Sequence, residues 1–259
     1  AVSEGKMRVC VYGSSSSNTS AKFMEASEEL GKQLALGGHV CVNGGGKTGC
    51  MGGVNEGCKK HGGKIVGVIH EMFLVDKEEF TGADEMLVAT GDGLAERKQL
   101  LVSGCDCIIA LPGGVGTWDE LWEAVAELSL GFNQIPICVV NVDGYYDSFR
   151  SMLQRAEKEK LIYQKSELLL HFAPDAADAI EWCEKMSKDN QFVAKGAARK
   201  LEKREPDSKS AAAPTAKKSA LSYKYNPYLG ARRGFLAGLL TGVAVGVVVA
   251  KTMSARSAR

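Results

Sequence analysis

Short apolar runs constrain this chain most strongly, because they recur through its first 142 residues with longer amphipathic stretches between them. Each run has four to six residues and is rich in Val and Ile. Runs that are apolar on both faces are typical of central strands in a parallel sheet, since helices cover both faces of such a sheet. We therefore predict strands at Arg8–Tyr12, Val40–Asn43, Ile65–Ile69, Met86–Ala89, Cys107–Leu111 and Ile137–Val142.

The stretches between and after these runs have the spacing of helices. The predicted helices are Ala21–Gly37, Asp92–Ser103, Thr117–Leu130, Tyr145–Lys158 and Asp175–Lys188. Strands that alternate with helices predict an α/β fold, a doubly wound parallel sheet of the Rossmann type with helices on both faces. A ligand of such a fold binds outside the carboxyl ends of the strands.

Charge divides the chain near residue 190. From residue 191 to the end there are 14 Lys and Arg against three Asp and Glu, a net charge of +11, whereas the remainder has 18 against 28, a net charge of −10. An acidic body is unlike a general nucleic-acid binder, so we expect no nucleic-acid partner. We predict a Rossmann-like domain over residues 1–190, a basic flexible linker over 191–230 and a membrane anchor over 231–259.

The predicted anchor is a hydrophobic helix formed by residues 234–250, which contain no charged residue. Seventeen residues at 1.5 Å each extend about 26 Å, close to the thickness of a hydrocarbon core. Arg232, Arg233 and Lys251 flank the run and can reach the headgroups. We expect a protein that is tail-anchored to an intracellular membrane with its body facing the cytosol; the alternative is a helix that docks on the body or on a partner.

Glycine-rich turns follow four of the predicted strands, at residues 13–17, 44–49, 91–93 and 112–117. A turn that opens a helix presents free backbone N–H groups, which can bind a phosphate. Gly46-Lys47-Thr48 is not part of a Walker loop, because the position that such a loop requires to be glycine is Cys41. The turn after the first strand also lacks the G-x-G-x-x-G pattern of a dinucleotide site.

Arg97 and Glu120 form the strongest candidate for chemistry. Arg97 follows one strand, and Glu120 is expected in the first helical turn after the next strand, so the two could enclose one ligand. The alternative is an ordinary ion pair on the surface. The eight cysteines and four histidines show no metal-binding spacing, and we expect free thiols and no metal or other cofactor.

The motifs of residues 5–190 resemble the LONELY GUY family of cytokinin riboside 5′-monophosphate phosphoribohydrolases. The family signature PGGxGTxxE stands at residues 112–120, its Arg-Lys pair at 97–98, GGGxxGxMG close to residues 44–52, and NVDGYY at 141–146. Val115 stands where plant members usually carry Tyr, and Ala126 where they commonly carry Thr. These departures bear on the choice of base and leave the Arg–Glu pair intact.

The resemblance implies hydrolysis of the N-glycosidic bond of cytokinin riboside 5′-monophosphates, without a cofactor, by a homodimer. It implies that Arg97 and Glu120 are catalytic and that a second set of residues binds the substrate. That set is Glu79, Lys98, Gly113, Gly114, Val115, Gly116, Thr117, Gly45 and Gly46. Two alternatives stay open: a general purine or pyrimidine 5′-monophosphate nucleosidase, and a non-catalytic nucleotide-binding module tethered to a membrane.

Overall fold

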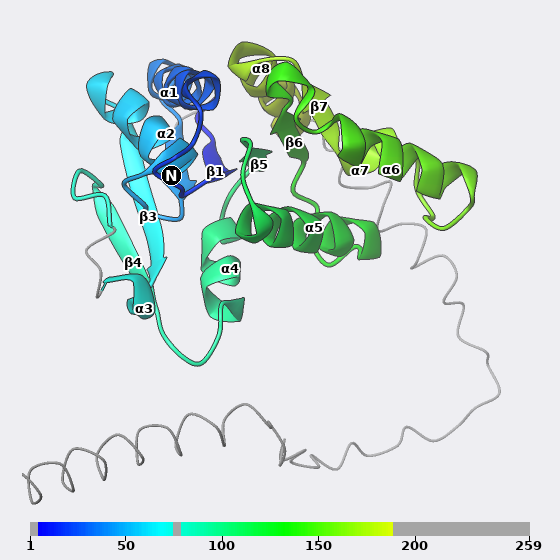
Figure 1. The fold of residues 1–259 in the computed structure, drawn as a ribbon, viewed down its shortest axis with the longest axis horizontal. Coiled ribbons are helices and arrows are strands. Elements are labelled where there is room, and N and C mark those ends of the chain that lie inside the picture. Colours follow the sequence, from blue (N-terminus) through cyan, green and yellow to red (C-terminus); the bar gives the residue numbers. More distant parts are fainter. Residues whose placement is uncertain (1–4, 75–78, 189–259) are drawn as a thin grey trace, which may run out of the picture. The chain divides into compact units, whose positions relative to one another are not determined.

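The computed structural model describes residues 5–74 and 79–188, which form a parallel sheet flanked by helices (Figure 1). The sheet has seven strands in the order β4-β3-β2-β1-β5-β6-β7, and every neighbouring pair is parallel. The strands are β1 (Arg8–Tyr12), β2 (Val40–Asn43), β3 (Lys64–His70), β4 (Glu85–Ala89), β5 (Cys107–Ala110), β6 (Ile137–Val140) and β7 (His171–Ala173). The predicted Rossmann-like sheet is confirmed, with all six predicted strands in place.

Helices cover both faces of the sheet, as predicted. They are α1 (Ala21–Leu36), α2 (Gly49–Lys60), α3 (Glu71–Leu74), α4 (Ala95–Val102), α5 (Val115–Leu130), α6 (Asp147–Lys158), α7 (Ser166–Leu169) and α8 (Ala176–Lys188), with a 3₁₀ turn, η1, at Val142–Gly144. The first core cluster joins the sheet to α1, α2 and α8, and the second joins it to α4, α5, α6 and α7. Each buried strand therefore contributes alternate side chains to two cores.

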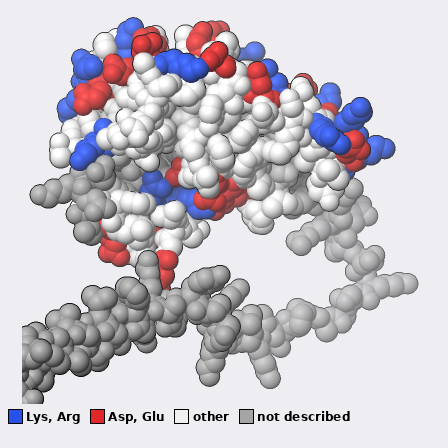
Figure 2. Space-filling view, viewed as in Figure 1, with Lys and Arg blue, Asp and Glu red and all other residues white. Residues whose placement is uncertain are grey.

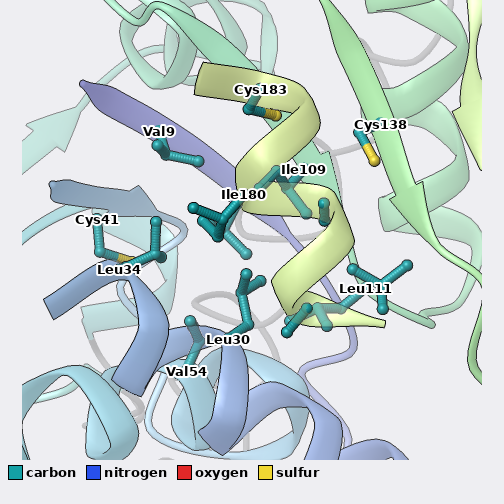
Figure 3. Packing of buried hydrophobic residues seen from close by; sticks show 14 of the residues in the cluster. Val9, Leu30, Leu34, Cys41, Val54, Ile109, Leu111, Cys138, Ile180 and Cys183 are labelled. Carbon is teal, nitrogen blue, oxygen red and sulfur yellow. The ribbon is translucent and has the colours of Figure 1, made fainter. Parts of the chain in front are cut away.

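The first core is filled by branched aliphatic side chains and by thiols. Leu30 and Leu34 of α1 and Ile180 of α8 pack against strand residues such as Val9 and Ile109 (Figure 3). All eight cysteines of the chain are buried free thiols, and several complete these two cores. Burial raises the pKa of the Cys41 thiol far above its usual value, as expected of a thiol that packs like a small apolar side chain.

The sequence pattern does not predict the short elements α3, α7 and η1, and it also misses α2 and β7. The sequence of α2 contains four glycines, which disfavour a helix. The fold uses glycine where α1 and α2 touch: a Cβ on Gly31 would lie 2.1 Å from the Val54 carbonyl oxygen, and one on Gly57 would lie 2.1 Å from that of Glu28. Contact with α1 thus stabilises a helix that is weak on its own. Strand β7 has only three residues at the sheet edge, too few for a clear pattern.

The predicted linker and membrane anchor lie outside the described residues. Within residues 5–74 and 79–188, no helix has both the length and the apolar character needed to cross a bilayer. The anchor over residues 231–259 stays a prediction.

Candidate functional site

The strand order reverses between β1 and β5, at the centre of the sheet. From β1 the chain builds outward through β2, β3 and β4, and from β5 it builds in the other direction through β6 and β7. In open sheets of this kind, ligands bind outside the carboxyl ends of the strands at the point where the order reverses, which here is between the loops after β1 and β5. One backbone hydrogen bond joins the loops, from the Ser14 N–H to the Pro112 carbonyl oxygen at 3.1 Å.

The loop after β5 leads directly into the amino terminus of α5. This helix begins at Val115, two residues earlier than predicted, so Gly114, Val115 and Gly116 all lie at its start. A Cβ added to Gly114 or Gly116 would meet no atom within 4 Å, and Val115 is 75% exposed. The first N–H groups of a helix have no partner inside the helix, and they attract anions. The start of α5 is therefore open to a phosphate.

Gly113 and Thr117 pack tightly beneath this open surface. Thr117 is buried, and a Cβ on Gly113 would lie 2.2 Å from the Thr117 Oγ1 and 2.9 Å from the Ser14 nitrogen. Only glycine permits this approach. Five loop residues are implied to bind the substrate. Gly114, Val115 and Gly116 are accessible, whereas Gly113 and Thr117 shape the loop.

Arg97 and Glu120 meet in a buried ion pair. The Arg97 Nη1 donates to the Glu120 Oε1 at 2.7 Å, and the Arg97 Nε donates to the Val68 carbonyl oxygen of β3 at 3.1 Å. Their side chains are only 10% and 13% exposed. The alternative of an ordinary surface pair is therefore wrong. Glu120 is the sixth residue of α5, so its expected place in the first turn is also wrong, because the helix starts at Val115.

Burial raises the pKa of the Glu120 carboxyl, while the charge and the hydrogen bond of Arg97 oppose that rise. The net pKa of Glu120 stays above its ordinary value, and Arg97 is the main group that opposes the effect of burial. Glu120 is five positions after Val115, which is about 7.5 Å along a helix axis. A ribose 5-phosphate is long enough to reach from the start of α5 to this carboxylate.

The glycine-rich loop after β2 lies against the same arginine. A Cβ on Gly44 would be 2.4 Å from the Arg97 Nη2, so this glycine admits the guanidinium. Two buried asparagines hold the loop. The Asn43 Oδ1 accepts from the Gly45 N–H at 2.8 Å, and the Asn55 Nδ2 donates to the Gly46 carbonyl oxygen at 3.1 Å. The Asn43 Nδ2 in turn donates to the Asn55 Oδ1 at 2.6 Å, which links β2 to α2.

Glu79 is joined to this loop by the backbone. It forms an isolated bridge with Gly46, and the N–H of Phe80 donates to the Gly45 carbonyl oxygen at 2.7 Å. The Glu79 Oε2 is buried without a hydrogen-bond partner among the described residues. An unpaired buried carboxylate oxygen is costly, and it is the kind of acceptor that a bound ligand can satisfy.

Lys98 lies on α4 next to Arg97, and its Nζ contacts two carboxylates of α5. It lies 3.0 Å from the Asp119 Oδ2 and also pairs with Glu123. Burial acts to lower the pKa of Lys98, but the hydrogen bonds to Glu123 and Asp119 outweigh it and the pKa is raised. Figure 2 shows basic and acidic side chains side by side over α4 and α5. Lys98 therefore ties these two helices together beside the Arg97–Glu120 pair.

The structure thus brings the predicted residues to the carboxyl end of the sheet. Their roles stay predictions. Sequence reasoning missed Asn43 and Asn55. Asn43 is marked only as a polar residue at the end of an apolar strand, and Asn55 only as a polar residue within a glycine-rich segment. The described residues contain no group of three His, Cys, Asp or Glu side chains that could hold a metal ion.

The sequence matches known proteins over most of the described region. Residues 51–183 match the family described as "Possible lysine decarboxylase". The cytokinin riboside 5′-monophosphate phosphoribohydrolase LOG of Oryza sativa subsp. japonica is 36% identical over 67% of this chain and 71% of that protein. A cytokinin riboside 5′-monophosphate phosphoribohydrolase of Arabidopsis thaliana is 33% identical over 72% of this chain and 86% of that protein.

Solved structures share the fold at lower identity. The molybdenum cofactor carrier protein of Chlamydomonas reinhardtii is 24% identical, with a TM-score of 0.54 over 71% of this chain and 99% of that chain. The molybdenum cofactor binding protein of Rippkaea orientalis is 22% identical, with a TM-score of 0.53 over 72% of this chain and 99% of that chain. These likenesses support the fold alone. The sequence matches go further: the chain belongs to the LONELY GUY (LOG) family of phosphoribohydrolases, a family of N-glycosyl hydrolases.

Proposed function

We propose that this enzyme hydrolyses the N-glycosidic bond of cytokinin riboside 5′-monophosphates and releases the free base and ribose 5-phosphate. The observation that carries the proposal is the buried Arg97–Glu120 pair, whose Glu120 lies on α5, the helix that begins at Val115. The names of relatives that are 31–36% identical support the substrate class.

The 5′-phosphate binds at the start of α5, where the N–H groups and the open space around Gly114 and Gly116 receive it. Binding of this remote group orients the ribose and contributes energy that the reaction uses. The anomeric carbon then lies near Glu120, whose carboxylate stabilises the positive charge that develops there. Water adds to that carbon and gives up a proton, while the base leaves with the electrons of the broken C–N bond and takes up a proton.

Arg97 opposes the rise in the Glu120 pKa that burial causes, and its guanidinium counters negative charge on the phosphate or on the departing base. The unpaired Glu79 Oε2 provides an acceptor for a donor group of the substrate near Gly46. Arg97 lies on α4, Glu120 on α5, and Glu79 in the segment between α3 and β4.

Chromatography for free base tests the proposal. The full-length protein is incubated with isopentenyladenosine monophosphate and, separately, with AMP. Faster release from the cytokinin nucleotide supports the proposal, and equal release from both indicates a general 5′-monophosphate nucleosidase. Binding without any release indicates a nucleotide-binding module and refutes hydrolysis.

Glu120→Gln supplies the matched variant for this assay. It keeps a hydrogen-bond acceptor for Arg97 but removes the charge, so base release should fall by at least about 100-fold. Glu123→Gln, one turn further along α5, is the control and should keep most of the activity. Similar rates for the two variants would remove Glu120 from the mechanism.

We also propose that the enzyme is a homodimer. Leu130 and Phe132, at and just after the end of α5, are 45% and 80% exposed, and the resemblance to the family implies a dimer. Light scattering of the purified chain in detergent measures its mass after subtraction of the micelle. A monomer at micromolar concentration contradicts this proposal.

Attachment to an intracellular membrane, with the enzyme facing the cytosol, is a further proposal. It is supported by the uncharged residues 234–250 and their basic flanks. After extraction of membranes at high pH, a spanning segment keeps the protein in the pellet. Release of the full-length protein into the supernatant would refute it.

A further inference from the structure

Three consecutive carbonyl groups in the loop between β5 and α5 each accept a hydrogen bond. The Leu111 carbonyl oxygen accepts from the Tyr146 hydroxyl at 2.7 Å, and that of Pro112 accepts from the Ser14 N–H at 3.1 Å. The Gly113 carbonyl oxygen accepts from the Tyr145 hydroxyl. The two tyrosines lie just after η1, more than 30 residues further along the chain.

The bond to Gly113 matters most, because the peptide that joins Gly113 to Gly114 has glycine on both sides. Glycine adopts positive φ values without a steric penalty, so nothing in these two residues prevents this peptide from rotating. In a planar trans peptide the C=O and the N–H point in opposite directions. When Tyr145 holds the Gly113 carbonyl on one side, the Gly114 N–H must point to the other side.

A rotated peptide would turn a carbonyl oxygen, instead of an N–H, toward a bound anion. That oxygen carries partial negative charge and would repel a phosphate at the start of α5. The hydroxyl of Tyr145 therefore selects the loop conformation that binds anions.

The position of Tyr145 is itself set by aromatic packing and by a second hydrogen bond. Its ring meets Phe23 edge-to-face at 5.5 Å and Tyr146 at 4.9 Å between centroids. The Trp118 Nε1 donates to the Tyr145 hydroxyl oxygen at 3.3 Å. A hydroxyl that accepts from Trp118 donates its own proton onward to Gly113, so the chain of bonds has one direction.

We propose that Tyr145 is a positioning residue for the substrate phosphate, which it serves by fixing the peptide between Gly113 and Gly114. Trp118 supports it through the indole N–H. This inference rests on the proposed function, and it adds a determinant of phosphate affinity that does not touch the substrate.

Tyr145→Phe is the sharpest test, because it keeps the ring and its contacts with Phe23 and Tyr146. We expect KM for the nucleotide to rise about tenfold, equivalent to the loss of one hydrogen bond, while kcat changes less than threefold. Tyr163→Phe removes a hydroxyl from a residue that is 89% exposed and should change neither constant. A Tyr145→Phe enzyme with unchanged KM would overturn the inference.

Calorimetry separates this inference from the proposed function. Tyr145→Phe should weaken the binding of ribose 5-phosphate about tenfold and leave the binding of free base unchanged. That result supports the positioning role even if the wild-type enzyme cleaves no nucleotide. An equal loss for both ligands indicates general damage to the site and overturns it, as does a wild-type protein that does not bind ribose 5-phosphate.

Trp118→Phe gives an independent check. Its effect on KM should be smaller than that of Tyr145→Phe, and in the double variant it should add almost nothing, since both act through one hydroxyl. Fully additive effects would show that Trp118 acts elsewhere and would contradict the proposed chain of bonds.

Discussion

Replacing Arg97 with Met should destabilise the protein far more than loss of an ordinary ion pair. The side chains of Arg97 and Glu120 are 10% and 13% exposed, so the variant leaves a buried carboxylate without its cation. Removing one partner of a buried pair lowers the free energy of unfolding by about 3–5 kcal/mol. Loss of an exposed pair, such as Lys60 with Glu28, changes it by less than about 1 kcal/mol.

The pH dependence of this loss identifies its cause. Burial already raises the pKa of Glu120, and Arg97 provides the leading opposing effects, so in Arg97→Met the pKa rises further. The folded variant then binds a proton that the unfolded chain has released above about pH 4.3. Its free energy of unfolding should therefore decrease as pH rises from that value toward the folded pKa, by up to about 1.4 kcal/mol per pH unit.

Urea unfolding at pH 5 and pH 8 measures both effects. The double variant Arg97→Met, Glu120→Gln has no buried carboxyl at this position. The additional decrease in its free energy of unfolding between pH 5 and pH 8 should therefore disappear. Lys60→Met serves as the exposed control. If Arg97→Met stays within about 1 kcal/mol of the wild type at both pH values, the pair is solvated and the reasoning about its burial is wrong.

Three glycine variants test the packing of the fold and of the loop. Gly31→Ala places a Cβ 2.1 Å from the Val54 carbonyl oxygen, so it should separate α1 from α2 and lower the free energy of unfolding by about 3 kcal/mol or more, measured by thermal unfolding. An unchanged melting temperature would contradict the close contact. Gly113→Ala, which meets the Thr117 Oγ1 at 2.2 Å, should raise KM for the nucleotide, whereas Gly116→Ala, which points into open space, should leave stability within about 0.5 kcal/mol of the wild type. Urea unfolding and initial rates are measured for Gly113→Ala and Gly116→Ala. Equal stabilities and equal KM values for these two variants would refute the difference in packing between the two glycines.

The sheet is predictable from sequence because its strands are apolar on both faces, and the site is predictable in outline because glycine-rich turns follow these strands. The burial of Arg97 and Glu120 is not predictable in this way, since charged residues lie on the surface in most proteins. Helix α2 is missed because its glycines oppose helix formation locally, and only contact with α1 shows their use.

Contacts between segments that are distant in sequence account for the other features that sequence does not predict. The hydroxyl of Tyr145 and the carbonyl of Gly113 are 32 residues apart, and the pattern NVDGYY alone does not indicate which tyrosine faces which backbone group. Asn43 and Asn55 likewise meet only because β2 and α2 pack side by side. Such pairs depend on the complete fold and have no local signal.

The place of β1 in the sheet limits how this enzyme can be divided. The region that matches the family begins at residue 51, after β1 and β2, yet β1 is the middle strand of the seven. A fragment that starts there has β3 and β5 with nothing between them, and each would expose an unpaired edge that invites aggregation. Arg97 and Glu120 would remain in that fragment, on α4 and α5, but the sheet beneath them would lack β1 and β2. A minimal or split form of this enzyme must therefore keep the first fifty residues, either in the same chain or supplied as a complementing peptide.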